Sequence, residues 1–125
     1  MSKGFCKAER LCRKKQIERI FAGGAHSFSL FPLRVVYMPM QDLDAEASVL
    51  ISVSKRHFKR AVKRNRVKRQ IREAYRLNKQ SLLECLREKQ CRVGIAFIYL
   101  SDELVNSELI QERMKVALSR IVERI

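Results

Sequence analysis

The stretch KRAVKRNRVKRQIREAYRLNK, residues 59–79, places ten lysines and arginines and a single acid, Glu73, on one predicted helix. At about 100° per residue, the apolar side chains gather on one side of this helix. That side consists of Val67, Ile71, Ala74, Leu82 and Cys85, if the helix runs on to about residue 88. The opposite side carries Asn65, Lys68, Arg69, Arg72, Arg76 and Lys79, flanked by Arg66. The pattern predicts a helix over about residues 59–88, packed on a sheet through its apolar side.

Concentrating cations in this way has a cost, because like charges three or four residues apart destabilise a helix by a few tenths of a kcal/mol per pair. Twelve of the 27 lysines and arginines, but only one of the 13 acids, lie between Lys55 and Lys79. A phosphate-binding surface benefits from such a block, because each cation that meets a phosphate releases counterions. Arg64 projects toward the apolar side and is predicted to lie near the helix start. The block therefore predicts a polyanionic partner.

The segments around the basic helix predict a small sheet. Pro32 and Pro39 restrict the first strand to an edge, or place the prolines at its ends, and Asn106 is a suitable N-cap for the last helix. The predicted elements are a helix at 13–22, a strand at 28–40, a strand or strand pair at 48–54, a strand at 92–99, and a helix from about 107. The nearly all-apolar strand 92–99 is predicted to be central.

These elements predict an α+β fold in which residues 1–125 form one domain. The predicted architecture is a two-layer sandwich of order α-β-β-β-α-β-α, with a small mixed sheet and helices packed on it. The basic helix would form the crossover between two parallel neighbouring strands.

The sequence argues against several other classes of protein. No His–carboxylate cluster, glycine-rich phosphate loop or Cys–His pair suggests catalysis by the protein. The spacing of Cys6, Cys12, Cys85 and Cys91 favours free thiols over a zinc site. No run approaches the roughly 18 apolar residues of a membrane span, and no secretory signal is evident, so we expect a cytoplasmic protein without membrane contact.

Two other interpretations of the basic helix are weaker. A membrane-surface or calmodulin-binding helix needs large exposed apolar residues, whereas this apolar side is small and β-branched. A helix-turn-helix needs a short helix just before the recognition helix, but the strand SVLISVS, residues 48–54, precedes it here.

Residues 52–76, SVSKRHFKRAVKRNRVKRQIREAYR, resemble the protein component of bacterial ribonuclease P. The shared features are a strand ending in Ser-Val-Ser-Lys (52–55) and a helix with Arg64-Asn65-Arg66, Val67, Lys68-Arg69 and Arg72. Weaker likeness runs from about Lys7 to the last helix. The family also implies a left-handed crossover, against the general rule.

The resemblance implies a ribonucleoprotein that removes the 5′ leader from precursor tRNA. The partners would be the catalytic RNA and precursor tRNA, with no membrane and no obligate protein partner. The RNA would perform the hydrolysis with Mg²⁺ that it holds itself, and no catalytic residues are expected on the protein. The residues expected to contact the catalytic RNA are Lys55, Arg56, Arg64, Asn65, Arg66, Lys68, Arg69, Arg72 and Arg76.

The resemblance also implies a cleft between the first helix and the sheet that takes the single-stranded leader. Its candidate residues are Ile17, Phe21, Phe31, Arg34, Val36 and Tyr37. Ile17 stands where many family members have Phe, which leaves less aromatic surface for stacking. Period-two alternation places Arg34 and Val36 on one face of the strand and Tyr37 on the other, and either face can line the cleft.

Two alternatives remain open at this point. A structural RNA-binding protein, such as a ribosomal protein or assembly factor, would use the same basic helix on a different RNA. A DNA-binding regulator fits less well, but it also requires a cationic surface.

Overall fold

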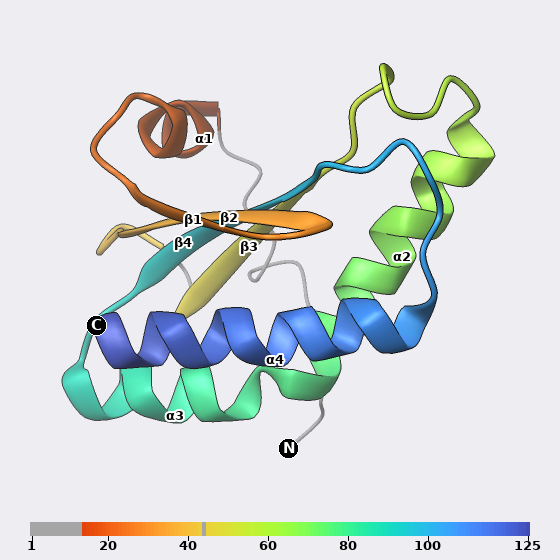
Figure 1. The fold of residues 1–125 in the computed structure, drawn as a ribbon. Coiled ribbons are helices and arrows are strands. Elements are labelled where there is room, and N and C mark those ends of the chain that lie inside the picture. Colours follow the sequence, from red (N-terminus) through yellow and green to blue (C-terminus); the bar gives the residue numbers. More distant parts are fainter. Residues whose placement is uncertain (1–13, 44) are drawn as a thin grey trace.

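A computed structural model of the chain describes residues 14–43 and 45–125, which form one α+β domain (Figure 1). The helices are α1 (Lys14–Phe21), α2 (Ala61–Asn78), α3 (Gln80–Lys89) and α4 (Ser107–Arg124). The strands are β1 (His26–Leu30), β2 (Leu33–Pro39), β3 (Ala47–Ser52) and β4 (Val93–Tyr99). In this part of the chain, no helix is long and apolar enough to cross a membrane.

The four strands form one mixed sheet in the order β1-β2-β4-β3. β4 pairs antiparallel with β2 and parallel with β3, so the predicted central position of this apolar strand is confirmed. The crossover between the parallel neighbours β3 and β4 runs through α2 and α3, as predicted. Its left-handed sense stays a prediction from the resemblance.

The predicted strand 28–40 is wrong in one respect, because this segment is a β-hairpin. Its two strands, β1 and β2, pair antiparallel through the turn at Phe31 and Pro32, which are joined by a cis peptide bond. Proline cannot donate to a sheet ladder, which explains why the strand breaks at this residue.

The prediction of one basic helix over residues 59–88 is wrong as well, because this segment forms two helices, α2 and α3, that meet at Lys79. The Asn78 side chain donates a hydrogen bond to the Ala74 carbonyl over 2.7 Å, an interaction that favours a helix bend or end. Beyond this point α3 turns and runs beside α4 (Figure 1). Past residue 78 the wheel is only partly right: Leu82 is buried as predicted, but Lys79, predicted on the cationic side, is buried as well.

The two faces of the sheet carry separate apolar clusters. The larger cluster joins the β-strand residues Val35, Ile95 and Phe97 to Ile71 of α2 and Met114 of α4. The last helix matches its prediction, since its apolar stripe is buried and Asn106 caps it by accepting a hydrogen bond from the Leu109 amide over 2.9 Å.

The opposite face carries a smaller cluster, in which Ile20 of α1 packs with Val36 and Ala96. A Cβ atom added at Gly94 would come within 2.7 Å of the Met40 sulfur and 3.2 Å of Ile20 Cδ1. Glycine at this position of β4 therefore lets α1 and Met40 lie close to the sheet. The predicted α+β class and mixed sheet are confirmed, and among residues 14–43 and 45–125 the second face is covered by the single helix α1.

Candidate nucleic-acid interface

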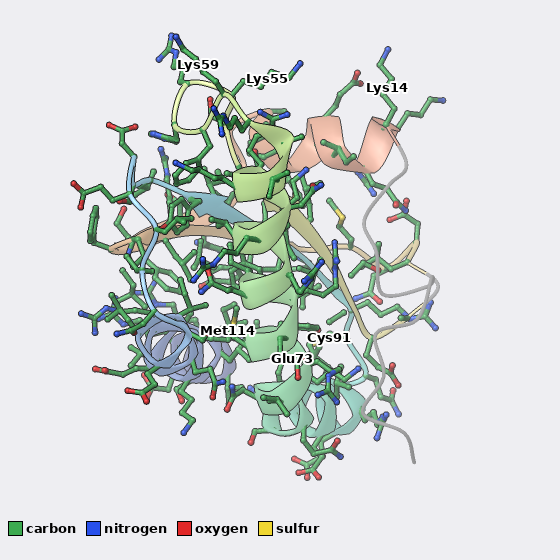
Figure 2. All side chains as sticks on the ribbon, turned by 90° about the vertical axis from the view of Figure 1, so that its right-hand side faces the viewer. Lys14, Lys55, Lys59, Glu73, Cys91 and Met114 are labelled. Carbon is green, nitrogen blue, oxygen red and sulfur yellow. The ribbon has the colours of Figure 1, made fainter. Side chains whose placement is uncertain are left out.

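Seven cationic side chains are fully exposed on the loop before α2 and on the first half of α2. We call this set the basic surface: Lys55, Arg56, Lys59, Arg60, Lys63, Arg66 and Arg69. None of these side chains forms a hydrogen bond or ion pair with another residue that the structure describes. Figure 2 looks onto α2 and shows Lys55 and Lys59 at its N-terminal end. Unpaired, solvent-exposed cations of this kind are free to meet phosphates.

The loop that carries half of the basic surface is held by internal contacts. The Arg64 guanidinium donates hydrogen bonds to the carbonyls of Phe58 and Lys59 over 2.7 and 2.9 Å. The buried Phe58 ring lies 5.9 Å from the Tyr99 ring. Arg64 therefore positions the loop, which gives a physical reason for the side chain that the wheel placed toward the apolar side.

A second tie to this loop could not be read from the sequence. His57 Nδ1 pairs with the Asp102 carboxylate, although the two residues are 45 positions apart. Asp102 follows β4, so the pair joins the loop before α2 to the loop before α4. No local pattern signals such a pair, because only the packing of β3 beside β4 brings the two loops together.

Most of the other residues predicted to contact RNA are less accessible to a partner than the basic surface. Asn65 is exposed, whereas Lys68 and Arg72 are half-buried. Arg76 is half-buried and donates to Glu73, with 3.1 Å between its Nε and Oε2. This hydrogen bond lowers the pKa of Glu73 below its usual 4.5, so the carboxylate is ionised at neutral pH and cancels the Arg76 charge.

Replacing Glu73 with Gln is therefore expected to release Arg76 and to strengthen binding to a structured RNA severalfold. If the released guanidinium meets a phosphate, the log–log salt slope should steepen by about 0.7–0.9. Titrations over a range of salt concentrations measure both effects. Glu88→Gln, an exposed site on α3 with the same charge change, is the control. Equal gains in both variants would mean that net charge, and not Arg76, is responsible.

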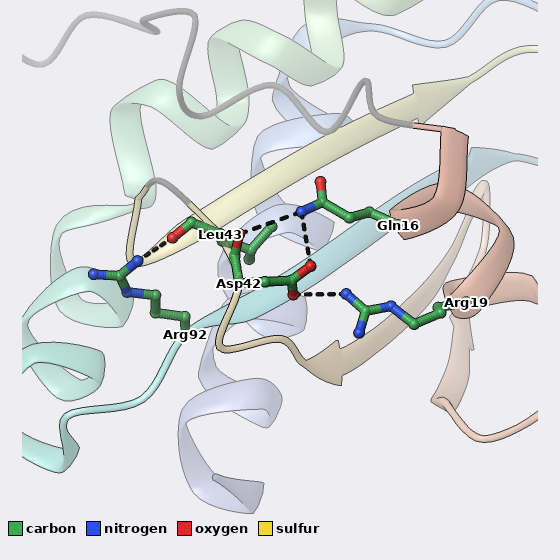
Figure 3. A network of polar contacts seen from close by, with 5 residues as sticks. All are labelled: Gln16, Arg19, Asp42, Leu43 and Arg92. Atoms are coloured by element: carbon green, nitrogen blue, oxygen red, sulfur yellow. Dashed lines mark hydrogen bonds and ion pairs between the residues drawn. The ribbon is translucent and has the colours of Figure 1, made fainter.

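A polar network fixes α1 above the sheet (Figure 3). Arg19 Nη2 donates to Asp42 Oδ1 over 2.6 Å, and Gln16 Nε2 donates to Asp42 Oδ2 over 3.3 Å. Arg19, followed by Gln16, lowers the pKa of Asp42 below its usual 3.8. Arg92 donates to the Leu43 carbonyl from the other side, so adjacent residues of the turn after β2 are tied to α1 and to the segment before β4.

Replacing Asp42 with Asn should loosen α1, because Arg19 loses a charged acceptor. We expect faster amide hydrogen exchange at residues 14–21 and unchanged exchange in α4, with Glu18→Gln as the charge-matched control. The pKa of Asp42 is lower in the folded protein than the usual 3.8, so its ionised carboxylate stabilises the fold above pH 3.8. This stabilisation is lost as the pH falls through the pKa of Asp42 in the folded protein. The difference between wild type and Asp42→Asn should therefore shrink as pH falls below 3.8 and disappear once pH is below the folded pKa of Asp42. A difference that persists there would contradict the role of this carboxylate.

The residues proposed for the leader cleft divide between the two faces of the sheet. Val36 lies on the α1 face, in the same apolar cluster as Ile17. Arg34, two residues earlier on β2, points to the same face by alternation and is exposed. Tyr37 lies on the opposite face, 2 % exposed, within the larger cluster. The α1 face is therefore the candidate surface, and Tyr37 does not belong to it.

The two phenylalanines proposed for the cleft are both exposed. Phe21, at the end of α1, is 51 % exposed, and Phe31, in the β1–β2 turn, is 62 % exposed. Exposed aromatic rings are suited to stacking on unpaired bases. The Phe31 carbonyl accepts a hydrogen bond from Arg113 Nε over 2.9 Å, which ties the hairpin turn to α4.

The described residues contain no group of three or more His, Cys, Asp or Glu side chains placed to hold a metal ion. Cys85 and Cys91 are free thiols, as expected, and Cys6 and Cys12 lie outside the described residues.

A mixed sheet with an exposed cationic loop and helix on one side defines a small α+β protein with a concentrated basic surface. The chain belongs to the ribonuclease P protein family, because the family model described as "Ribonuclease P" matches residues 5–122. The ribonuclease P protein component of Porphyromonas gingivalis (strain ATCC 33277) is 46 % identical over 119 residues, covering 94 % of this chain and 86 % of the relative.

Solved structures agree with this assignment. The RNase P protein of Staphylococcus aureus is 26 % identical, with a TM-score of 0.72 over 92 % of this chain and 96 % of that one. The RNase P protein of Thermotoga maritima, 22 % identical, has the same fold, with a TM-score of 0.63 over 94 % of this chain and 97 % of that one.

Proposed function

We propose that this chain is the protein subunit of a ribonuclease P that removes the 5′ leader from precursor tRNA. The observation that carries the proposal is the basic surface, seven exposed cations without partners among the described residues, on the element that bears the family motif. Arg66 and Arg69 would contact phosphates of the catalytic RNA directly. Arg64 would hold the loop that presents Lys55 and Arg56.

The α1 face of the sheet would bind the single-stranded leader. Ile17 and Phe21 would line it from α1, and Arg34 and Val36 would line it from β2, since Ile17 and Val36 share a cluster and Phe21 and Arg34 are exposed. A cation beside exposed apolar and aromatic side chains is the combination by which proteins hold single-stranded RNA. Phe31, in the β1–β2 turn, would extend this surface along the sheet edge.

The catalytic RNA would perform the hydrolysis and hold the Mg²⁺, as the resemblance implies. By neutralising nearby phosphates and holding the leader, the protein would let the RNA work at lower Mg²⁺ concentration. The proposed location is cytoplasmic, with no membrane and no obligate protein partner. A structural RNA-binding protein is the second candidate, and only the identity of the bound RNA separates the two.

Reconstitution with the matching catalytic RNA tests this proposal. At low Mg²⁺, where the RNA alone is slow, adding the protein should restore cleavage of precursor tRNA at the leader junction. The protein without RNA should give no site-specific product. Cleavage by the protein alone would overturn the division of labour, and absence of stimulation with the matching RNA would favour the second candidate.

A further inference from the structure

A small cavity lies at the end of the sheet beside the C-terminal end of α4. Its volume is about 220 Å³, and its lining includes His26, Tyr37, Pro39, Arg92, Val93 and Arg124. Drug-sized ligands occupy pockets of roughly 300–1,000 Å³, so this cavity suits a single ring system.

The cavity is remote from the basic surface. α4 meets α2 near its own N-terminus, where Gln70 donates to the Val105 carbonyl and to Ser107 Oγ. The cavity adjoins the other end of this 18-residue helix, about 27 Å away at 1.5 Å per residue. Figure 1 shows the C-terminus and α2 at opposite ends of the molecule.

Tyr37 lines this cavity and carries a hydroxyl group without a partner among the described residues. The side chain is 2 % exposed, and its buried hydroxyl forms no hydrogen bond with any residue that the structure describes. Buried hydroxyl groups are normally paired, and an unpaired one is energetically unfavourable. A ligand with a hydrogen-bond acceptor would supply the missing partner.

The remaining polar groups present stacking and anion-binding surfaces. The exposed His26 ring lies 5.4 Å from the Tyr37 ring, tilted by 32°. The Arg124 guanidinium lies 5.4 Å from the centre of the Phe28 ring. One nitrogen of the Arg92 guanidinium donates to the Leu43 carbonyl (Figure 3), and its remaining N–H groups can bind an anion.

We propose that this cavity binds one unstacked base of a single-stranded RNA. Tyr37 donates its hydroxyl hydrogen to a base acceptor, His26 provides a stacking surface, and Arg92 and Arg124 contact the adjoining phosphates. Apolar walls, an imidazole and paired guanidinium groups are the chemistry with which proteins hold splayed bases. The site is separate from both surfaces of the proposed function and does not depend on them.

Nuclear magnetic resonance of the ¹⁵N-labelled full chain tests the site with three probes: a mixed-sequence single-stranded RNA decamer, adenosine 5′-monophosphate and inorganic phosphate. The decamer and the nucleotide should shift the amide signals of His26, Tyr37 and Val93, and phosphate at equal concentration should not. The decamer should saturate these signals at the lower concentration. Tighter binding of the free nucleotide, shifts with phosphate alone, or no shift with the decamer would each overturn the proposal.

Tyr37→Phe removes only the hydroxyl and should raise the Kd read from these signals about two- to tenfold. Its Tm should stay unchanged or rise, because an unpaired buried group is lost. Tyr99→Phe is the matched control, since the Tyr99 hydroxyl donates to the Glu103 carbonyl over 2.6 Å, far from the cavity. It should lower Tm and leave the Kd unchanged.

A further pair of variants separates this cavity from the basic surface. Arg124→Ala, at an exposed position, should weaken binding at the cavity without unfolding the protein. The double variant Arg66→Ala/Arg69→Ala should retain the nucleotide-induced shifts. Wild-type Kd in both Tyr37→Phe and Arg124→Ala, or loss of the shifts in the double variant, would overturn the proposal.

Discussion

Replacing Arg66 and Arg69 together with alanine is expected to lower affinity for the catalytic RNA roughly ten- to hundredfold at physiological salt. Both guanidinium groups are exposed on α2, and neither is neutralised by an acid among the described residues. If each contacts one phosphate, the log–log salt slope should become shallower by about 0.7–0.9 per arginine. Salt-dependent binding titrations measure the affinity and the slope in the same experiment.

The control for this experiment is Lys115→Ala, which removes one exposed cation from α4. It should leave the slope unchanged, because α4 lies outside the basic surface. The single variants Arg66→Ala and Arg69→Ala should each give about half of the change in slope. An unaltered slope in the double variant, or an equal change in Lys115→Ala, would refute the assignment of the basic surface.

Replacing Phe97 with alanine is expected to destabilise the fold by about 3–5 kcal/mol. Phe97 lies in the central strand β4 with no exposed surface, and its ring lies 6.1 Å from the Tyr75 ring of α2. Its loss leaves a cavity between the sheet and the helix that carries the basic surface. Because natural domains have only about 5–15 kcal/mol of stability, this change should lower the Tm substantially.

Phe21→Ala is the matched control for this prediction. It removes the same ring, but from a position that is 51 % exposed at the end of α1, so the free energy of unfolding should change by about 0.5 kcal/mol or less. Chemical denaturation measures both variants. A destabilisation of similar size in the two would contradict the assignment of Phe97 to the core. The same Phe21 variant should reduce leader binding if the α1 face holds the leader.

The basic helix illustrates both the reach and the limit of sequence-based prediction. Val67, Ile71 and Ala74 are buried as the wheel predicts, because 3.6-residue periodicity applies within an unbroken helix. Past Asn78 the helix axis changes, so Lys79 is buried and Leu86, rather than Cys85, reaches the core. A single wheel drawn over residues 61–88 therefore misplaces some positions after the break, although Leu82 is buried as predicted.

The hairpin shows a related limit. Thirteen residues rich in aromatic and β-branched side chains predict one strand, and the prolines predict an edge position or strand ends. Neither signal predicts that the chain reverses direction. Once the chain reverses, the register is set by pairing, with His26 opposite Tyr37 and Ser29 opposite Arg34. The assignment of Arg34 and Tyr37 to opposite faces follows from alternation alone.

The sequence by itself determined the α+β class, the central apolar strand, the capped last helix and the concentration of charge on one segment. Each depends on periodicity or composition within a single element, which the chain encodes locally. Only the tertiary structure decided which sheet face lies under α1, which arginines stay unpaired, and how His57 meets Asp102 or Arg19 meets Asp42. These features join residues far apart in the sequence, so they exist only after the sheet and helices have packed.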